Sequence, residues 1–351
     1  MSFVPERDRP LAGLTTLGLG GSAQYFVGPH TRAELLTALT WARDQKMAVH
    51  ILGGGSNLVV SDLGMPGLTL RMQTRGITLR EQGEHVLLTA EAGEPWQAVV
   101  DSALAHDLAG LECLTGIPGS AGATPIQNVG AYGQEVSDTL LEVEVLERAT
   151  LDVQTWSHAD CQLGYRDSRF KREPERFVVL SVTFRLQKHG APSVRYAELQ
   201  RALATSNPSL REVATTVRRL RGAKSMLLDA QDPNGRNAGS FFKNPIVSAS
   251  DAARVRALCV AEGIVASEAE VPCFPAADGQ VKLAAGFLIE RAGIAKGLRR
   301  GQVGTSSKHA LCLVHHGGGS TAQLLALADE IRSIVQQRFG VVLELEPVRW
   351  G

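Results

Sequence analysis

Three polar residues lie in apolar or glycine-rich segments that are far apart in the chain of 351 residues. Arg166 lies in the string GYRDS, Ser240 in AGSFFKNP, and Glu346 near the carboxyl end. A guanidinium group can bind a planar carboxylate, and a hydroxyl in an apolar setting can donate a proton. A carboxyl in a strand is costly unless it is used or paired.

Each of these residues also has a plainer interpretation. Arg166 could pair with Asp167 or another acid, which is the commoner fate of a lone arginine. Ser240 could bond only to the backbone. Glu346 could be an exposed residue of an edge strand. Taken one at a time, none of the three establishes a catalytic site.

A glycine-rich loop, Gly110 to Asp138, is the second candidate. It holds six glycines, two prolines and few charges. Neither helical spacing nor the alternation of an exposed strand is present. Glycine lets the backbone approach a ligand closely and leaves N–H groups to point at it, while Pro118 and Pro125 stiffen the path. This pattern favours a loop that lies against a large, partly charged ligand, and a simple connection between strands is the alternative.

The string Gly53-Gly-Gly-Ser-Asn57 lies between two predicted strands, 49–52 and 58–60. Its N–H groups could form a nest for a phosphate group. A tight β-turn without a ligand fits the local sequence equally well.

Hydrophobic periodicity and capping signals predict the elements that position these segments. Helices are expected at 31–47, from 94 onward, from the capping boxes Ser209/Glu212 and Ser320/Gln323, from 250, and at 283–292. Strands are expected within 69–92, 140–157 and 177–187, and at 309–314 and 341–350. Composition changes near 188–192 and 229–235, where domain boundaries are expected.

The composition is that of a globular protein, with 44% hydrophobic residues and 36 basic against 36 acidic side chains. A net charge of zero argues against nucleic acid or an anionic membrane as a partner. The five cysteines form no CxxC pair, which indicates neither a zinc site nor a disulfide framework and favours a reducing cytosol. No signal peptide or membrane-spanning run is found, and no exposed apolar helix, so a cytoplasmic monomer is expected.

Together the motifs resemble the family of UDP-N-acetylenolpyruvoylglucosamine reductases, the flavoenzymes of bacterial peptidoglycan synthesis. The strings GGGSN, TGIPGSAGATPIQNVGAYG, GYRDS, AGSFFKNP and KLAAGFLIE occur in this order and span nearly the whole chain. The second and fourth strings are specific to the family. GGGSN is shared with other flavoproteins of the vanillyl-alcohol-oxidase type.

The resemblance implies an α+β fold with an FAD-binding part of the vanillyl-alcohol-oxidase (PCMH) type. This part would consist of two subdomains, 1–68 (with a C-terminal strand, 341–351) and 69–228, and an α+β substrate-binding domain would span 229–340. FAD would be bound non-covalently and reduced by NADPH. The flavin would then pass a hydride to UDP-N-acetylglucosamine enolpyruvate, giving UDP-N-acetylmuramate, so the activity implied is that of a UDP-N-acetylmuramate dehydrogenase.

The resemblance also implies residue roles. Arg166 would bind and polarise the substrate carboxylate, Ser240 would protonate the enol carbon, and Glu346 would assist Arg166. Glu344, two residues upstream, is the alternative carboxyl. The FAD-binding residues implied are Gly53, Gly54, Gly55, Ser56, Asn57, Thr115, Gly116, Ile117, Pro118, Gly119, Ser120, Gly122, Ala123, Gln127, Asn128, Gly130, Ala131 and Tyr132. The UDP-sugar contacts implied are Tyr196, Lys224, Asn244 and His309, where His309 stands in place of a glutamine of some relatives. Tyr196 matches the subclass whose tyrosine loop closes over substrate.

Two other functions fit parts of the pattern. An oxidase of the same fold often holds its flavin covalently through a histidine or cysteine, but the glycine-rich loop has no histidine and only one thiol, Cys113. A non-catalytic protein that binds nucleotide sugars is the second rival, and the polar trio Arg166, Ser240 and Glu346 argues against it.

Overall fold

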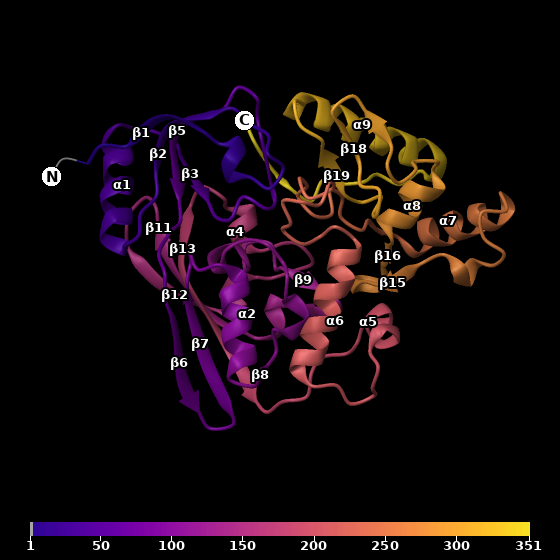
Figure 1. Ribbon diagram of the computed structural model, residues 1–351, viewed down its shortest axis with the longest axis horizontal. Helices are drawn as coiled ribbons and strands as arrows, with labels where there is room; N and C mark the ends of the chain where they lie inside the picture. Colours follow the sequence, from indigo (N-terminus) through magenta and orange to yellow (C-terminus); the bar gives the residue numbers. More distant parts are fainter. Residues whose placement is uncertain (1–2) are drawn as a thin grey trace. The chain divides into compact units, whose positions relative to one another are not determined.

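The computed structural model describes residues 3–351, which divide into two units (Figure 1). The first unit consists of the residues up to Leu14, Ser22–Gly55 and Gly64–Leu228. The second consists of Thr15–Gly21, Ser56–Leu63 and Asp229–Gly351. The finer division into three domains stays a prediction.

A mixed sheet of four strands forms one part of the first unit. Its order is β1 (Glu6–Pro10), β2 (Ser22–Val27), β5 (Met65–Arg71) and β3 (Val49–Leu52). Strands β2 and β3 both run parallel to β5. Helix α1 (Arg32–Asp44) follows β2, and the Thr31 hydroxyl accepts a hydrogen bond of 3.1 Å from the Glu34 N–H, which confirms the predicted helix start.

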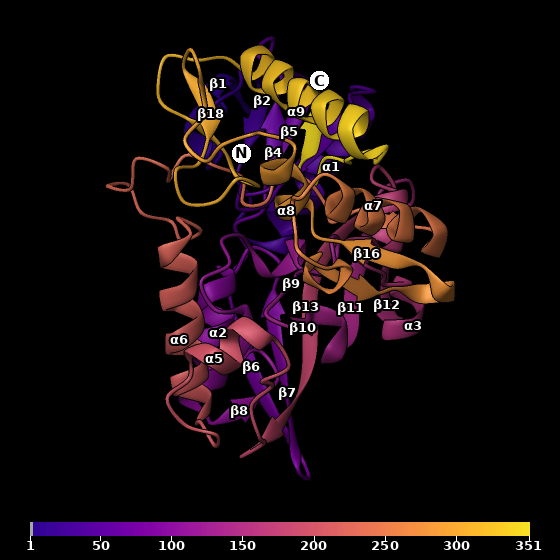
Figure 2. The same cartoon turned by 90° about the vertical axis from the view of Figure 1, so that its right-hand side faces the viewer.

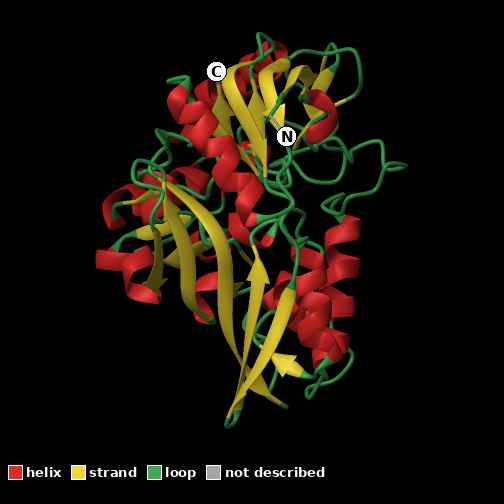
Figure 3. Ribbon diagram, turned by 90° about the vertical axis from the view of Figure 1, so that its left-hand side faces the viewer, coloured by secondary structure: helices red, strands yellow, loops and turns green. Residues whose placement is uncertain are grey.

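A larger antiparallel sheet forms the rest of the framework of this unit. Its order is β12 (Val153–Ser157), β11 (Leu140–Glu147), β13 (Phe177–Lys188), β7 (His85–Glu91) and β6 (Ile77–Gln82), and the short β8 (Leu108–Ala109) also pairs with β13. Figure 3 shows its long, twisted strands. The first eight residues of β13 are all buried, because this strand lies in the middle of the sheet.

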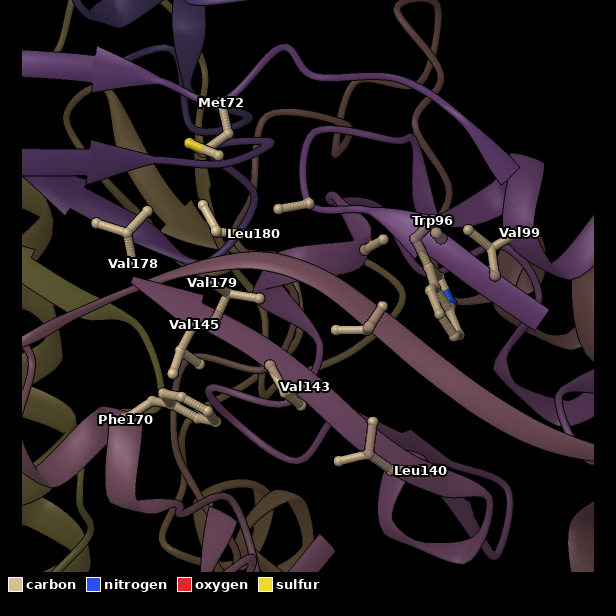
Figure 4. Packing of buried hydrophobic residues seen from close by; sticks show 14 of the residues in the cluster. Met72, Trp96, Val99, Leu140, Val143, Val145, Phe170, Val178, Val179 and Leu180 are labelled. Atoms are coloured by element: carbon tan, nitrogen blue, oxygen red, sulfur yellow. The ribbon is translucent and has the colours of Figure 1, made fainter. Parts of the chain in front are cut away.

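One continuous hydrophobic core joins both sheets to α1 and to α2 (Trp96–Ala105) (Figure 4). The Trp96 ring packs edge-on against Phe184 of β13, with centroids 5.6 Å apart, and its Nε1 donates to the Leu114 carbonyl over 3.0 Å. Trp96 therefore ties the sheet to the start of the glycine-rich loop. Helices α3 (His158–Cys161), α4 (Arg169–Arg172), α5 (Ala197–Ala202) and α6 (Leu210–Ala223) complete the unit, and α5 and α6 lie side by side (Figure 2).

The second unit has its own core between three helices and short strands. The helices are α7 (Ala249–Ala261), α8 (Ala285–Arg291) and α9 (Thr321–Phe339), and the capping box of Ser320 and Gln323 begins α9 as predicted. Two three-stranded sheets have the orders β14 (Ile246–Val247), β16 (Val281–Leu283), β15 (Cys273–Pro275) and β17 (Arg299–Arg300), β18 (Val303–Thr305), β19 (Leu313–His315). Strands β4 (Leu58–Val60) and β20 (Val348–Trp350) pair in parallel.

Two predicted strands are shorter than expected. The segment expected at 309–314 is a turn followed by β19 at Leu313–His315. The segment expected at 341–350 is a strand only at Val348–Trp350, so Glu344 and Glu346 lie outside it. Pro347 has no N–H to give to a ladder, and residues 344–346 bond instead to residues 241–243.

Within residues 3–351, no helix combines the length and the apolar character needed to cross a membrane. The same part of the chain contains no cluster of three or more histidine, cysteine, aspartate or glutamate side chains that could hold a metal ion.

Candidate active site

The glycines at 53–55 lie directly against the glycine-rich loop, and both segments belong to the first unit. A Cβ built on Gly54 would lie 2.6 Å from the Cα of Gly119, and one on Gly53 would lie 2.8 Å from the Ser120 Oγ. Gly55 has φ +65°. These approaches are open only to glycine, so the two predicted FAD-binding strings form one backbone surface.

The glycine-rich loop has no α-helix, as predicted. It contains three-residue helical turns at Glu112–Leu114, Ala121–Ala123 and Val136–Asp138. It also contains a short antiparallel hairpin of two two-residue strands, β9 (Gly130–Ala131) and β10 (Gln134–Glu135). Its middle is anchored to the segment before α2, where Ala121 N–H donates to the Glu94 carbonyl over 2.8 Å and Gly122 N–H to the Ala92 carbonyl over 2.9 Å.

Gln97 and Arg221 hold the start of the TGIPGS string. The Gln97 Oε1 accepts a bond of 2.6 Å from the Gly116 N–H, and the Arg221 Nε donates to the Gly116 carbonyl over 3.2 Å. Gln97 carries no sequence signal, because only the apolar positions of its helix follow a helical period. Arg221 carries no signal that separates it from the other arginines of α6.

Arg166 lies at the tip of a narrow turn that points at the same loop. Gly164 and Asp167 exchange backbone hydrogen bonds of 2.9 and 3.2 Å, and Arg166 has φ +53°. Its Nη2 donates to the Gly130 carbonyl over 2.6 Å, and its Nη1 to the Asn128 carbonyl over 3.3 Å. Asp167, the acid considered as its partner, is ion-paired with Arg172. Two carbonyls of the predicted FAD-binding string therefore orient the guanidinium.

Asn128 bonds both to the glycine-rich loop and to the turn that carries Arg166. It is buried, with φ +41°, and its Nδ2 donates to the Glu135 carboxylate over 2.9 Å and to the Gly164 carbonyl over 3.0 Å. Its Oδ1 accepts from the Ser137 N–H over 3.0 Å. One side chain thus connects the hairpin of the loop to the turn that carries Arg166.

Tyr132, Tyr196 and Lys224 form a cluster in the first unit. The two rings meet edge to face with centroids 5.6 Å apart, and the Lys224 Nζ lies 5.6 Å from the Tyr132 centroid. Lys224 also pairs with Glu198 over 2.6 Å. Burial raises the pKa of Tyr132 to about 12 and raises the pKa of Tyr196 as well, so both phenols are hydrogen-bond donors at neutral pH. Glu198 carried no sequence signal, because its importance comes from a partner 26 residues away.

The backbone of Glu346 lies next to Ser240 in the second unit. The Glu346 N–H donates to the carbonyl of Phe241 over 3.0 Å, and the Asn57 Nδ2 donates to the Glu346 carbonyl over 3.4 Å. Ser240 and Glu346 are both half-buried. Glu344 differs from Glu346, because its side chain is 72% exposed and pairs with Lys243 over 3.0 Å.

Asn244 and His309 have backbone partners in the same unit. The Asn244 Oδ1 accepts from the N–H of Ala285, the first residue of α8, over 2.9 Å. The His309 carbonyl accepts from the Cys312 N–H over 3.1 Å.

The predicted residues therefore group by unit. The first unit brings together Gly53–Gly55, the loop residues from Thr115 to Tyr132, Arg166, Tyr196 and Lys224. The second unit contains Ser56, Asn57, Ser240, Asn244, His309 and Glu346.

Two family models match the chain. The FAD binding domain matches residues 23–151, and the C-terminal domain of UDP-N-acetylenolpyruvoylglucosamine reductase matches residues 231–350. The first match contains both glycine strings, and the second contains Ser240 and Glu346. The FAD-binding fold expected from the sequence is thereby confirmed.

Similar proteins extend over the whole chain. UDP-N-acetylenolpyruvoylglucosamine reductase of Streptomyces coelicolor is 46% identical, covering 98% of this chain and 90% of its own, and that of Pseudomonas fluorescens is 38% identical over 100% of both. The crystal structure of the enzyme of this name from Thermus caldophilus has a TM-score of 0.67 at 25% identity and covers 99% of both chains. The chain belongs to the UDP-N-acetylenolpyruvoylglucosamine reductase family.

Proposed function

We propose that this protein reduces UDP-N-acetylglucosamine enolpyruvate to UDP-N-acetylmuramate with NADPH, in peptidoglycan synthesis. The observation that carries the proposal is the full-length similarity to reductases of this name, 46% over 98% of the chain, together with the paired glycine strings of the first unit. Bound FAD supplies the redox chemistry by taking a hydride from NADPH and passing it to the enolpyruvyl double bond.

The glycine strings hold the FAD. The turn at 53–57 takes the pyrophosphate, and the loop from Thr115 to Tyr132 takes the isoalloxazine. The support is steric, because neither Gly53 nor Gly54 has room for a Cβ: the Ser120 side chain lies against Gly53 and the Gly119 backbone against Gly54. Backbone N–H groups without side chains suit an anionic group.

Arg166 binds the substrate carboxylate and stabilises the negative charge that grows when a hydride reaches the neighbouring carbon. Its two bonds to the carbonyls of Asn128 and Gly130 hold the guanidinium in one orientation before substrate arrives. A preorganised cation gains more in the transition state than a mobile one, because no reorientation is needed during the reaction.

Ser240 protonates the enol carbon, and Glu346 shares the charge of the substrate carboxylate with Arg166. A hydroxyl is a weak acid, so it serves here only because the carbanion-like carbon is strongly basic. Glu346 is favoured over Glu344, because Glu344 is exposed and ion-paired with Lys243.

Tyr196, Lys224, Asn244 and His309 bind the UDP-sugar, and the chain belongs to the subclass with a closing tyrosine loop. The support for the first two is their common cluster with Tyr132, in which phenol and ammonium donors stand together. The protein acts as a cytoplasmic monomer, and the lack of a disulfide among the cysteines of residues 3–351 suits a reducing compartment. The domains are 1–68 with 341–351, then 69–228, and 229–340.

Anaerobic stopped-flow absorbance of the flavin tests the function in two steps. NADPH is expected to bleach the yellow protein, and the enolpyruvyl UDP-sugar is then expected to restore the colour. A purified protein that carries no flavin and cannot be reconstituted contradicts the proposal, and so does a reduced flavin that the UDP-sugar leaves unchanged.

A further inference from the structure

Glu112 is a buried acid whose carboxylate joins three separate segments of the first unit. Only 1% of the surface of Glu112 is exposed to solvent. Oε2 accepts from the Gly110 N–H over 2.8 Å, while Oε1 accepts from the Ser193 N–H over 2.7 Å and from the Gln134 Nε2 over 3.2 Å. A buried carboxylate is tolerated only when it is bonded in this way, so these three contacts are mutually dependent.

The carbonyl of Ser193 is held on the other side by the neighbour of Glu112. The Cys113 Sγ donates to this carbonyl over 3.1 Å, and the Cys113 N–H donates to the Gln134 Oε1 over 2.9 Å. The N–H and the carbonyl of Ser193 are therefore both bound by two consecutive residues of one helical turn, Glu112–Leu114. We call the bonds of Glu112 and Cys113 to Ser193 the Ser193 clamp.

The clamp matters because the segment around it has no regular structure. Strand β13 ends at Lys188 and α5 begins at Ala197, so residues 189–196 have neither a strand nor a helix to hold them. Residues 191–195 line a cleft of about 480 Å³, and Val194 also packs against the small hydrophobic cluster of Cys113, Leu199, Val213 and Val217. Besides the clamp, the Gln200 side chain binds the Val194 carbonyl over 2.8 Å.

Tyr196 follows the clamp by three residues. The Tyr196 ring packs edge to face against the Tyr132 ring, and the Lys224 Nζ lies over the same Tyr132 ring. We propose that Glu112 is a positioning residue for substrate binding, because its bond to the Ser193 N–H sets where Tyr196 stands against Tyr132 and Lys224. This inference rests on the proposed function, in which Tyr196 binds the UDP-sugar.

Two substitutions separate positioning from general structural support. Glu112→Ala removes every acceptor, so the Ser193 N–H loses its partner. The Cys113 bond to the Ser193 carbonyl remains, so the segment is loosened at one side of the clamp. Glu112→Gln keeps one oxygen, which can remain at the Ser193 N–H and Gln134, but its NH2 group would face the Gly110 N–H, donor against donor. Glutamine is therefore expected to restore only part of what alanine removes. Glu81→Gln is the matched control, because Glu81 pairs with Lys188 at the start of the same segment but is 82% exposed.

The measurements are the NADPH half-reaction, the substrate half-reaction, and amide hydrogen exchange over residues 189–200, all on the FAD-loaded protein. For Glu112→Ala we expect an unchanged rate of flavin reduction, a KM for the enolpyruvyl UDP-sugar about tenfold higher, and faster exchange of the Ser193 amide. Titration with UDP-N-acetylmuramate, followed by the flavin spectrum, is expected to give a similarly weakened Kd. Glu112→Gln is expected to lie between Glu112→Ala and the parent protein, and Glu81→Gln to match the parent protein.

Four results overturn the inference. One is an unchanged KM in Glu112→Ala despite faster exchange at Ser193. Another is a loss of FAD or of NADPH reduction that parallels the loss of substrate binding. If Glu112→Ala does not yield folded holoprotein, exchange in the parent protein decides, and a Ser193 amide that exchanges as fast as its neighbours overturns the clamp. A fourth result concerns the parent protein. If the UDP-sugar cannot reoxidise its reduced flavin, the proposed function is wrong, and the inference fails with it.

Discussion

The side-chain amide of Asn57 donates to the backbone carbonyl of Glu346 over 3.4 Å. The N–H of the same glutamate donates to the carbonyl of Phe241 over 3.0 Å, and Phe241 directly follows Ser240. Two strings of the sequence, GGGSN and AGSFFKNP, therefore meet at the backbone of one acid. Its position is set by these bonds and not by a regular strand, because β20 begins only at Val348.

This position gives the first prediction, which compares two glutamates. Glu346→Gln is expected to slow flavin reoxidation by the UDP-sugar by about 10²-fold, since the carboxyl proposed to assist Arg166 at the substrate carboxylate is lost. Glu344→Gln removes only an ion pair in which Glu344 is 72% exposed, and such pairs contribute at most about 1 kcal/mol. Stopped-flow rates of both variants are compared. If flavin reoxidation is slow in Glu344→Gln and normal in Glu346→Gln, Glu344 is the glutamate that assists Arg166.

Local signals in the sequence were sufficient for much of the fold. The boxes Ser209/Glu212 and Ser320/Gln323 begin helices α6 and α9 as expected, because a capping box is made by residues three apart. The irregular course of the glycine-rich loop was equally predictable, since six glycines within 110–138 oppose both helix and ladder.

Long-range pairing could not be predicted in the same way. The final segment alternates like a strand, yet residues 344–346 bond to residues 241–243 and only Val348–Trp350 pairs with β4. Partners such as Glu198 for Lys224 are set by tertiary structure. The grouping of Arg166 with Gly130 likewise depends on a turn whose direction no local pattern specifies. The roles of these residues in the reaction stay predictions.

Gly54→Ala is expected to weaken FAD binding. The new Cβ would lie 2.6 Å from the Cα of Gly119 and 3.0 Å from its carbonyl carbon, and two backbones cannot both keep their places. Overpacking of this kind costs about 1–3 kcal/mol, so the ratio of FAD to protein after gel filtration should fall. Gly13→Ala is the control, because a Cβ there meets nothing within 4 Å. Full FAD occupancy in Gly54→Ala would show that the two strings can separate without loss of the cofactor.

Tyr196→Phe is expected to bind the UDP-sugar more weakly with little change in the flavin spectrum. The ring contact with Tyr132 is kept, and only the phenol donor is lost, which is worth about 0.5–1.5 kcal/mol for a typical hydrogen bond. Titration with UDP-N-acetylmuramate gives the Kd. Tyr25→Phe, a tyrosine of β2 in the other sheet of the same unit, is the control. Equal affinities of both variants and the parent would remove Tyr196 from the site.

The flavin is expected to be released by acid rather than bound covalently to Cys113. Burial raises the pKa of the Cys113 thiol well above its usual range and raises that of Cys161 to about 12. Because the thiolate is the nucleophile, a raised pKa lowers the reactive fraction at every pH below it. Iodoacetamide at pH 8 should therefore spare both in the native protein and label them after denaturation, with the partly exposed Cys273 as the internal comparison. A yellow acid precipitate would instead support the covalent oxidase alternative.

Ser240→Ala tests the proton donor. NADPH should reduce the flavin at the parent rate, because the hydroxyl takes no part in that step, while reoxidation by the UDP-sugar should slow by about 10²–10⁴-fold, the usual value of general acid catalysis. Ser250→Ala, at an exposed position of α7, is the matched control. If the variant loses FAD or fails in both half-reactions alike, Ser240 supports the Asn237–Phe242 backbone and is not the acid.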